Sequence, residues 1–184
     1  MTTAGDRSFA LALFRQWVAE AVDSGVVEPT AMALATANKA GFPAARMVLL
    51  RQADDRGFVF YTNLGSRKAF DITENPYAAL MFFWPELDRE VQIVGRVEPV
   101  DATEADNYFA SRPVLSRIGA WASRQSRPLP SRFLLLCRII RFAVIWALGR
   151  LTRPAFWSGF RVVPEEIRFR SKDDIQIFSS LAIS

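Results

Sequence analysis

The chain has 184 residues, of which 51% are hydrophobic and 23% charged, a composition typical of a folded domain with its own core. It has no histidine and one cysteine, Cys137, which excludes histidine-based metal sites, Ser-His catalytic pairs and an internal disulfide. The net charge of +4 hides an asymmetry: residues 1–111 carry 10 basic and 15 acidic side chains, and residues 112–184 carry 13 and 4.

The basic C-terminal part has two explanations, which the sequence leaves open. Such a surface can meet nucleic acid, a membrane or a phosphorylated ligand. It can also reflect the codon usage of a GC-rich genome, because 20 of the 23 basic residues are arginine. The N-terminus lacks the basic segment and apolar run of a signal peptide, and we therefore expect a cytoplasmic protein.

The first half of the chain predicts strands interrupted by helices. A helix is expected where Phe14 and Val18 share an apolar face, and it ends at Gly25. The expected elements are a helix over 8–23, an apolar segment over 31–38, a hairpin of strands 45–52 and 58–62 joined by a turn over 54–57, a helix over 66–75, and strands over 77–84 and 89–100.

The second half is expected to be mostly helical before it returns to strands. Thr103 and Asp106 resemble a capping box, and Pro113 takes the favoured first-turn position of a further helix. The expected elements are helices over 103–111 and from 113, a basic proline-rich loop over 124–132, an apolar helix over 133–148, and short strands over 157–164 and 166–170. We predict one α+β domain, residues 1–184, built around an antiparallel barrel or sheet.

The apolar segment 133–148 raises the question of a membrane. It is shorter than the ~20 residues that span a bilayer, and Arg138 and Arg141 interrupt it. We expect a buried or half-buried helix, with a basic helix lying on a membrane surface as the alternative.

The strongest local pattern is FYTNLGSRKA, residues 60–69, in which a strand turns at Gly65 and enters a helix at Ser66. Arg67 and Lys68 then stand in the first helical turn, where the helix dipole already favours anions. The pattern indicates an anion such as a phosphate, although it is not a P-loop. The alternative is a solvated helix start.

Other candidates are less specific. Arg46 shares a strand face with Val48 unless a bulge intervenes, and needs an anion or a carboxylate partner, with Asp54 or Asp55 as the alternative to a ligand. The spacing of Tyr108, Arg112 and Ser116 places them on one face if the helix continues, which a residue before proline disfavours. Trp121 and Trp157 are expected in the core, and no metal site is expected.

Taken together, these segments resemble the pyridoxine/pyridoxamine 5′-phosphate oxidase family. The resemblance covers roughly residues 8–165 and follows RMVLLR, FYTNLGSRKA, NPYAALMFFW, YFASRPVLSRIGAWASRQS and FWSGFRV in order. It implies an FMN-binding split β-barrel, a Greek-key antiparallel barrel with flanking helices. It also implies a homodimer with FMN at the subunit interface.

The resemblance also implies the site residues. The FMN set is Arg46, Met47, Val48, Leu49, Leu50, Arg51, Tyr61, Thr62, Arg67, Lys68, Glu90 and, from the partner subunit, Gln125 and Ser126. The two cations of the GSRKA segment would hold the FMN phosphate. Arg51, Tyr108, Arg112 and Ser116 would hold the phosphate of the substrate. The implied reaction oxidises pyridoxamine or pyridoxine 5′-phosphate to pyridoxal 5′-phosphate, with O2 as acceptor and H2O2 as product.

The sequence departs from the family in two places. Glu90 stands where the family usually has a glutamine. After FWSGFRVVPEEI, Arg170 takes a tryptophan position, and Ile175, Ile177 and Ser179 stand at about the positions of an arginine, a histidine and a second arginine. The resemblance therefore leaves the catalytic residues unassigned.

Four functions remain open at this point: the oxidase itself, a split-barrel oxidase of another substrate such as a phenazine precursor, a non-catalytic protein that binds FMN or pyridoxal phosphate, and a nucleic-acid or membrane-surface binder. The presence of Tyr108, Arg112 and Ser116 favours the first, because a substrate without a phosphate would not need these residues. The altered C-terminus favours the third. We expect no nucleic acid and no membrane as partners.

Overall fold

The computed structural model describes residues 4–122, 132–149, 151–172 and 174–179. The strands are β1 Ala31–Ala37, β2 Pro43–Leu49, β3 Gln52–Asp54, β4 Gly57–Asn63, β5 Tyr77–Trp84, β6 Arg89–Pro99, β7 Trp157–Arg170 and β8 Ile175–Ser179. The helices are α1 Ala4–Asp23, α2 Arg67–Glu74, α3 Ala102–Ser111, α4 Val114–Ala122 and α5 Arg132–Ala147, with a short 3-10 helix, η1, at Pro85–Leu87.

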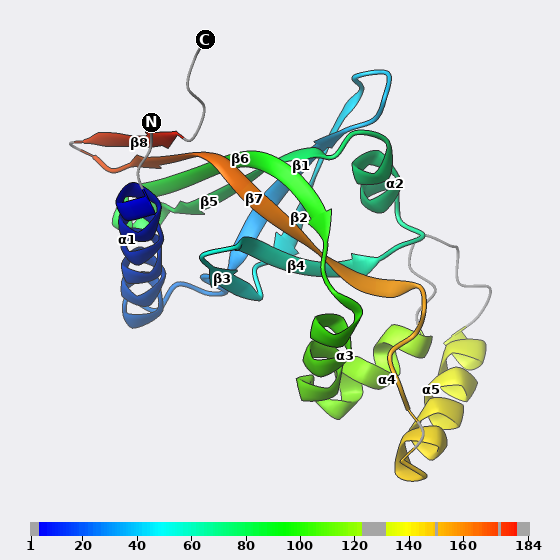
Figure 1. Cartoon of the computed structure of the whole chain (residues 1–184). Helices are drawn as coiled ribbons and strands as arrows, with labels where there is room; N and C mark the ends of the chain where they lie inside the picture. Colours follow the sequence, from blue (N-terminus) through cyan, green and yellow to red (C-terminus); the bar gives the residue numbers. More distant parts are fainter. Residues whose placement is uncertain (1–3, 123–131, 150, 173, 180–184) are drawn as a thin grey trace.

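The strands form one curled antiparallel sheet, a half-barrel (Figure 1). Its order is β2-β1-β5-β6-β7-β4-β3, and β8 pairs with β7. Figure 1 shows α1 at one end of the sheet and α3, α4 and α5 at the other, while α2 lies near β1. The expected split-barrel fold is confirmed.

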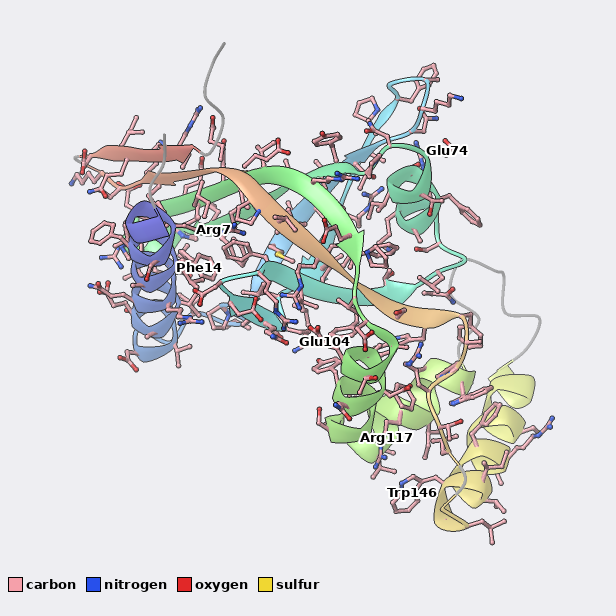
Figure 2. The ribbon with its side chains drawn as sticks, in the orientation of Figure 1. Arg7, Phe14, Glu74, Glu104, Arg117 and Trp146 are labelled. Atoms are coloured by element: carbon pink, nitrogen blue, oxygen red, sulfur yellow. The ribbon has the colours of Figure 1, made fainter. Side chains whose placement is uncertain are left out.

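The inner face of the sheet holds the core, as the alternating sequence of the strands requires. Leu80 and Phe82 of β5 and Val91 and Ile93 of β6 are fully buried. Phe14 points from α1 into this face (Figure 2) and packs edge-on against Phe58 and Phe82, each at a centroid distance of 5.0 Å. The apolar stripe expected on the first helix therefore closes one side of the half-barrel.

The outer face carries exposed apolar side chains on β2 and β5, which lie on either side of β1. Met47, Ala33 and Met81 lie side by side across β2, β1 and β5 in the strand register. Phe83, two residues beyond Met81 on β5, is 54% exposed, and Tyr77 is also exposed on this strand. We call Tyr77, Met81, Phe83 and Met47 the outer apolar face.

Two strand predictions were wrong in a way that matters for the site. The expected strand over 45–52 breaks at Leu50, so β2 pairs with β1 and only the short β3 forms the hairpin with β4. The backbone N–H of Arg51 donates to the carbonyl of Val59 at this break. The two strands expected over 157–164 and 166–170 are the single long strand β7.

The helix expected over 133–148 is confirmed as α5. Phe142 packs against Trp121 of α4 at 5.2 Å, whereas Ile140 and Val144 are exposed. In the described part of the chain, no helix has the length and apolar character needed to cross a membrane.

Candidate functional site

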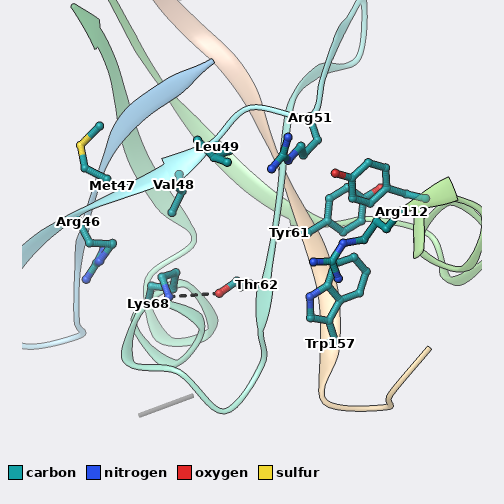
Figure 3. A pocket seen from close by; sticks show the side chains of 11 residues that line it. Arg46, Met47, Val48, Leu49, Arg51, Tyr61, Thr62, Lys68, Arg112 and Trp157 are labelled. Carbon is teal, nitrogen blue, oxygen red and sulfur yellow. Dashed lines mark hydrogen bonds between the residues drawn. The ribbon is translucent and has the colours of Figure 1, made fainter. Parts of the chain in front are cut away.

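A cavity of about 290 Å³ lies where β2, β4 and the first turn of α2 meet the end of α3 and the start of β7 (Figure 3). Cations stand at two ends of this cavity and aromatic rings form a wall of it. Its lining is Arg46, Met47, Val48, Leu49, Arg51, Tyr61, Thr62, Lys68, Tyr108, Arg112 and Trp157.

The first cationic end is built by the helix start that the sequence singled out. Lys68 Nζ donates to Thr62 Oγ1 at 3.2 Å and to Ser66 Oγ at 3.3 Å, so the Ser66 side chain receives the ammonium and makes no cap bond to the helix. Burial lowers the pKa of Lys68, and the nearby charge of Arg46 lowers that pKa further. No carboxylate among the described residues forms an ion pair with Lys68. This end is suited to an anion.

Arg46 reaches the same end from β2, with its side chain on the face of Val48. Its Nη1 donates to Thr36 Oγ1 at 2.7 Å, and its Nη2 lies 3.6 Å from Asp71 Oδ2. Burial lowers the pKa of Arg46, and Asp71 opposes that effect. The carboxylate partner expected at Asp54 or Asp55 is therefore Asp71.

A stack of rings forms the wall between the cationic ends. Tyr61 of β4 stacks on Tyr108 of α3 at 4.1 Å and on Trp157 of β7 at 5.0 Å. Gly159 pairs with Tyr61 in the strand register, and a Cβ there would lie only 2.8 Å from the Tyr61 ring. Glycine is therefore required for the ring to lie flat on β7. Burial, followed by the charge of Glu104, raises the pKa of Tyr61 to about 12, so its hydroxyl keeps its proton at neutral pH.

The second cationic end is Arg112, with Arg51 near it. Arg112 adopts an extended conformation before Pro113 and ends α3, so the helical face expected for Tyr108, Arg112 and Ser116 is broken. Its guanidinium lies over the Trp157 ring at 4.8 Å, and its buried Nη1 has no hydrogen-bond partner. Burial lowers the pKa of Arg112, and the charge of Arg51 lowers that pKa further. An unpaired buried guanidinium N–H requires an acceptor, which a bound anion would supply.

The structure brings together most of the predicted site residues, and it places four elsewhere. Leu50 is buried in the core, and Arg67 is exposed on α2, where its charge reaches Arg46 although it does not line the cavity. Ser116 lines an adjoining cavity that it shares with Arg112. The Glu90 carboxylate lies 3.0 Å from Arg170 Nη2, away from this cavity. Gln125 and Ser126 lie outside the described residues.

The C-terminal positions also lie away from the cavity of their own chain. Ile175, Ile177 and Ser179 belong to β8, which pairs with the half of β7 that is remote from Trp157. Figure 1 shows β8 near the start of α1, across the sheet from α3 and α4.

Three residues of the site were missed from local patterns. Trp157 is buried, as expected, but its role was missed, because it also lines the cavity and carries Arg112 on its ring. Thr36 and Asp71 contact Arg46 from behind the cavity. Asp71 follows Arg67 by one helical turn, and this spacing is the one sequence signal that could have placed it near the cations.

A flavin mononucleotide fits this set of side chains in its chemistry. The ammonium of Lys68, which has no carboxylate partner among the described residues, and the guanidinium of Arg46 suit its phosphate, and the aromatic wall suits a flat ring system.

Comparisons with known proteins agree with this chemistry. The sequence model described as pyridoxamine 5′-phosphate oxidase matches residues 18–145. Two relatives carry the name pyridoxine/pyridoxamine 5′-phosphate oxidase. The one from Maricaulis maris is 53% identical over 89% of this chain and 74% of its own length. The one from Rhodospirillum rubrum is 54% identical over 86% of this chain and 81% of its own length.

Solved structures share the fold. PhzG from Burkholderia lata, in complex with tetrahydrophenazine-1-carboxylic acid, is 31% identical with a TM-score of 0.79 and covers 91% of this chain and 90% of its own. A pyridoxamine 5′-phosphate oxidase-related FMN-binding protein from Nostoc punctiforme has a TM-score of 0.68 at 13% identity, covers 90% of this chain and 96% of its own, and shows the fold alone. The chain therefore belongs to the pyridoxamine 5′-phosphate oxidase family.

Proposed function

We propose that the protein is an FMN-dependent oxidase that converts pyridoxamine or pyridoxine 5′-phosphate into pyridoxal 5′-phosphate. The observation that carries this proposal is one cavity with two separate groups of cations. Lys68 and Arg46 line one end, where the charge of Arg46 lowers the pKa of Lys68, and Arg112 and Arg51 line the other, where the charge of Arg51 lowers the pKa of Arg112. Two anionic groups are therefore expected in one cavity: the phosphate of the cofactor and the phosphate of the substrate.

The proposal assigns roles to the lining residues. Lys68, Arg46 and the helix start at Ser66 hold the FMN phosphate, with Arg67 adding charge from the surface. Arg51 and Arg112 hold the substrate phosphate, and Tyr108 and Ser116 border it. When bound, FMN supplies the acceptor for a hydride from the substrate C4′ carbon and passes the two electrons to O2, which becomes H2O2. The side chains orient the two reactants and neutralise their charges.

A homodimer belongs to the same proposal. The exposed Tyr77, Met81 and Phe83 share one side of β5, and Met47 lies on the same side two strands away, a grouping typical of a surface that meets another chain. In this proposal Gln125 and Ser126 of the partner subunit would reach the first copy's cofactor, as the family resemblance implies. A cytoplasmic location stays a prediction.

Two alternatives have support of their own. The likeness to PhzG favours an oxidase of a phenazine-type substrate, although such a substrate needs no second phosphate site. The residues Ile175, Ile177 and Ser179 favour a protein that binds FMN or pyridoxal phosphate without turning it over.

One experiment tests the proposal. The purified protein is examined for a flavin spectrum, then mixed with pyridoxamine 5′-phosphate under air while pyridoxal phosphate and peroxide are measured. Both products are expected in equal amounts. Bound flavin without products would favour the non-catalytic alternative. A phenazine precursor is offered in a parallel reaction, and turnover of that precursor alone would favour the phenazine-type oxidase. A protein that binds no FMN would refute the proposal.

The Arg112→Ala variant tests the second phosphate site. Losing this guanidinium is expected to raise the KM for pyridoxamine 5′-phosphate at least tenfold, because a charged hydrogen bond contributes about 1.5–3 kcal/mol. Flavin content should stay near that of the wild type. If Arg112→Ala lost flavin and substrate affinity to the same extent, the two cationic ends of the cavity would not bind separate phosphates.

A further inference from the structure

A buried chain of side chains stands behind the cationic end of the cavity. Asp71 of α2 is 4% exposed and Thr36 of β1 is 3% exposed. The Thr36 hydroxyl donates a hydrogen bond to Asp71 Oδ2 at 2.7 Å, and Thr36 Oγ1 accepts a hydrogen bond from Arg46 Nη1 at 2.7 Å. The three residues therefore link three elements, α2, β1 and β2.

The direction of these hydrogen bonds is fixed by the chemistry of the groups. A guanidinium only donates and an ionised carboxylate only accepts, so the hydroxyl between them must accept from Arg46 and donate to Asp71. Arg46 Nη1 also donates to the Leu34 carbonyl at 3.3 Å. The guanidinium is thus held from the side of the sheet, and it still lines the cavity.

Arg46 needs such support because of where it lies. In the described sheet, β2 is an end strand that pairs only with β1, so one neighbour alone fixes its position. The positive charges of Arg46 and Lys68 also repel each other when no anion is bound, and the charge of Arg67 repels Arg46 as well. Asp71 is the one carboxylate of the described residues within ion-pair distance of Arg46, and it comes from the helix that carries Lys68.

We propose that Asp71 and Thr36 are positioning residues that hold Arg46 beside Lys68, so that the FMN phosphate meets a preformed pair of cations. The proposal rests on the proposed FMN-dependent function and goes beyond the residues that the family resemblance implied. Preformed charges bind an anion more tightly because no side chain must be ordered at the moment of binding.

The test compares FMN with riboflavin, which has the same ring system and no phosphate. Dissociation constants are measured by flavin fluorescence for the full chain and for Asp71→Asn, Thr36→Val and Thr36→Ser. Glu74→Gln is the matched control, because it neutralises an exposed carboxylate at the end of the same helix. Thermal unfolding without flavin is recorded for each variant.

Asp71→Asn and Thr36→Val are expected to weaken FMN binding about tenfold, which corresponds to about 1.4 kcal/mol. Riboflavin binding should change less than twofold. Thr36→Ser, which keeps the hydroxyl, and Glu74→Gln should both bind FMN like the wild type. Should Asp71→Asn fail to fold, the smaller Thr36→Val change carries the test.

Three results would overturn the inference while leaving the proposed function intact. Tighter FMN binding by Asp71→Asn would mean that the carboxylate only repels the phosphate. Equal weakening of FMN and riboflavin, with a lower unfolding temperature, would mean a purely structural role. Unchanged FMN binding in every variant would refute the positioning role alone. A wild-type protein that binds neither flavin would refute the proposed function, and this inference with it.

Discussion

Lys68 shows how one residue sets the working conditions of the site. It is held between two hydroxyl groups, and both burial and a neighbouring cation lower the pKa of its ammonium below the ordinary value of 10.5. The folded protein therefore loses this proton at a lower pH than the unfolded chain does. Between the two pKa values the unfolded chain binds more protons, so this group's contribution to stability rises with pH.

The affinity for FMN is expected to change in the opposite direction. It should fall as pH rises through the lowered pKa of Lys68, because the neutral amine no longer attracts the phosphate. A Lys68→Arg variant should keep its affinity to higher pH, since a guanidinium stays charged there. Dissociation constants measured between pH 7 and pH 10.5 for both proteins check this, and the flavin's own titration is common to both. If the dissociation constants of both proteins changed with pH in parallel, the loss of affinity could not be assigned to the titration of Lys68.

Residue-level prediction succeeded where the chemistry was local. Gly65, Ser66 and Lys68 lie within four residues of each other, so one short segment of the sequence predicted the end of the strand, the turn and the cation at the helix start. Asp71 and Thr36 could not be assigned to Arg46 in the same way, because their contacts depend on the packing of α2 over β1 and on the pairing of β1 with β2.

Among the elements, α3 is tied to the sheet by a cluster of charges. Arg161 of β7 is 6% exposed and pairs through its two Nη atoms with Asp54 at 2.8 Å and with Glu104 at 2.5 Å. Glu104 stands in the first turn of α3, on its sheet-facing end (Figure 2). Since α3 carries Tyr108 and ends at Arg112, this cluster fixes the helix that shapes the second cationic end.

Removing the central arginine should loosen this attachment. Arg161→Met is expected to lower the free energy of unfolding by about 1.5–3 kcal/mol, because two partly buried carboxylates lose one of their two arginine partners and keep only the exposed Arg56. Arg168→Met is the control, since its pair with Glu166 is largely exposed and contributes about 1 kcal/mol or less. Urea denaturation at pH 7 compares the two variants. Equal losses for both would show that the cluster does not stabilise the fold more than a surface pair.

The elements themselves were mostly predictable from hydrophobic periodicity, and their pairing was not. The break at Leu50 lies in an unbroken apolar run, so no turn residue announced that β2 and β3 have different partners. Pro164 lies within β7, where proline normally ends a strand. The strand continues because the register of its partner shifts between Val94 and Gly95.

At the scale of the whole molecule, we propose that the outer apolar face is the surface through which two copies assemble. The wild type is expected to be a dimer at micromolar concentration. Phe83→Asp should raise the dissociation constant of the dimer at least tenfold, because the new carboxylate would be buried in the interface without a partner. Val27→Asp is the control, since Val27 is exposed in the loop after α1. Sedimentation velocity distinguishes the two variants, and a Phe83→Asp dimer as stable as the wild type would place the interface elsewhere.

The fold as a whole followed from the family resemblance more than from the strand pattern. Alternation in β5 and β6 indicates a sheet with one buried face, but the sheet order depends on contacts between distant segments. The one-domain assignment of residues 1–184 and the roles given to the site residues stay predictions until such experiments are done.

The pairing of β4 with β7 has a consequence for the making of the protein. These strands lie roughly a hundred residues apart in the chain, so β4 leaves the ribosome long before its neighbour exists. At ~5–20 residues per second the interval is about 5–20 seconds. Throughout it, Phe58 and Phe60 stand on an unpaired strand edge. The nascent chain, rather than the finished molecule, is therefore the form most exposed to aggregation and most in need of chaperones.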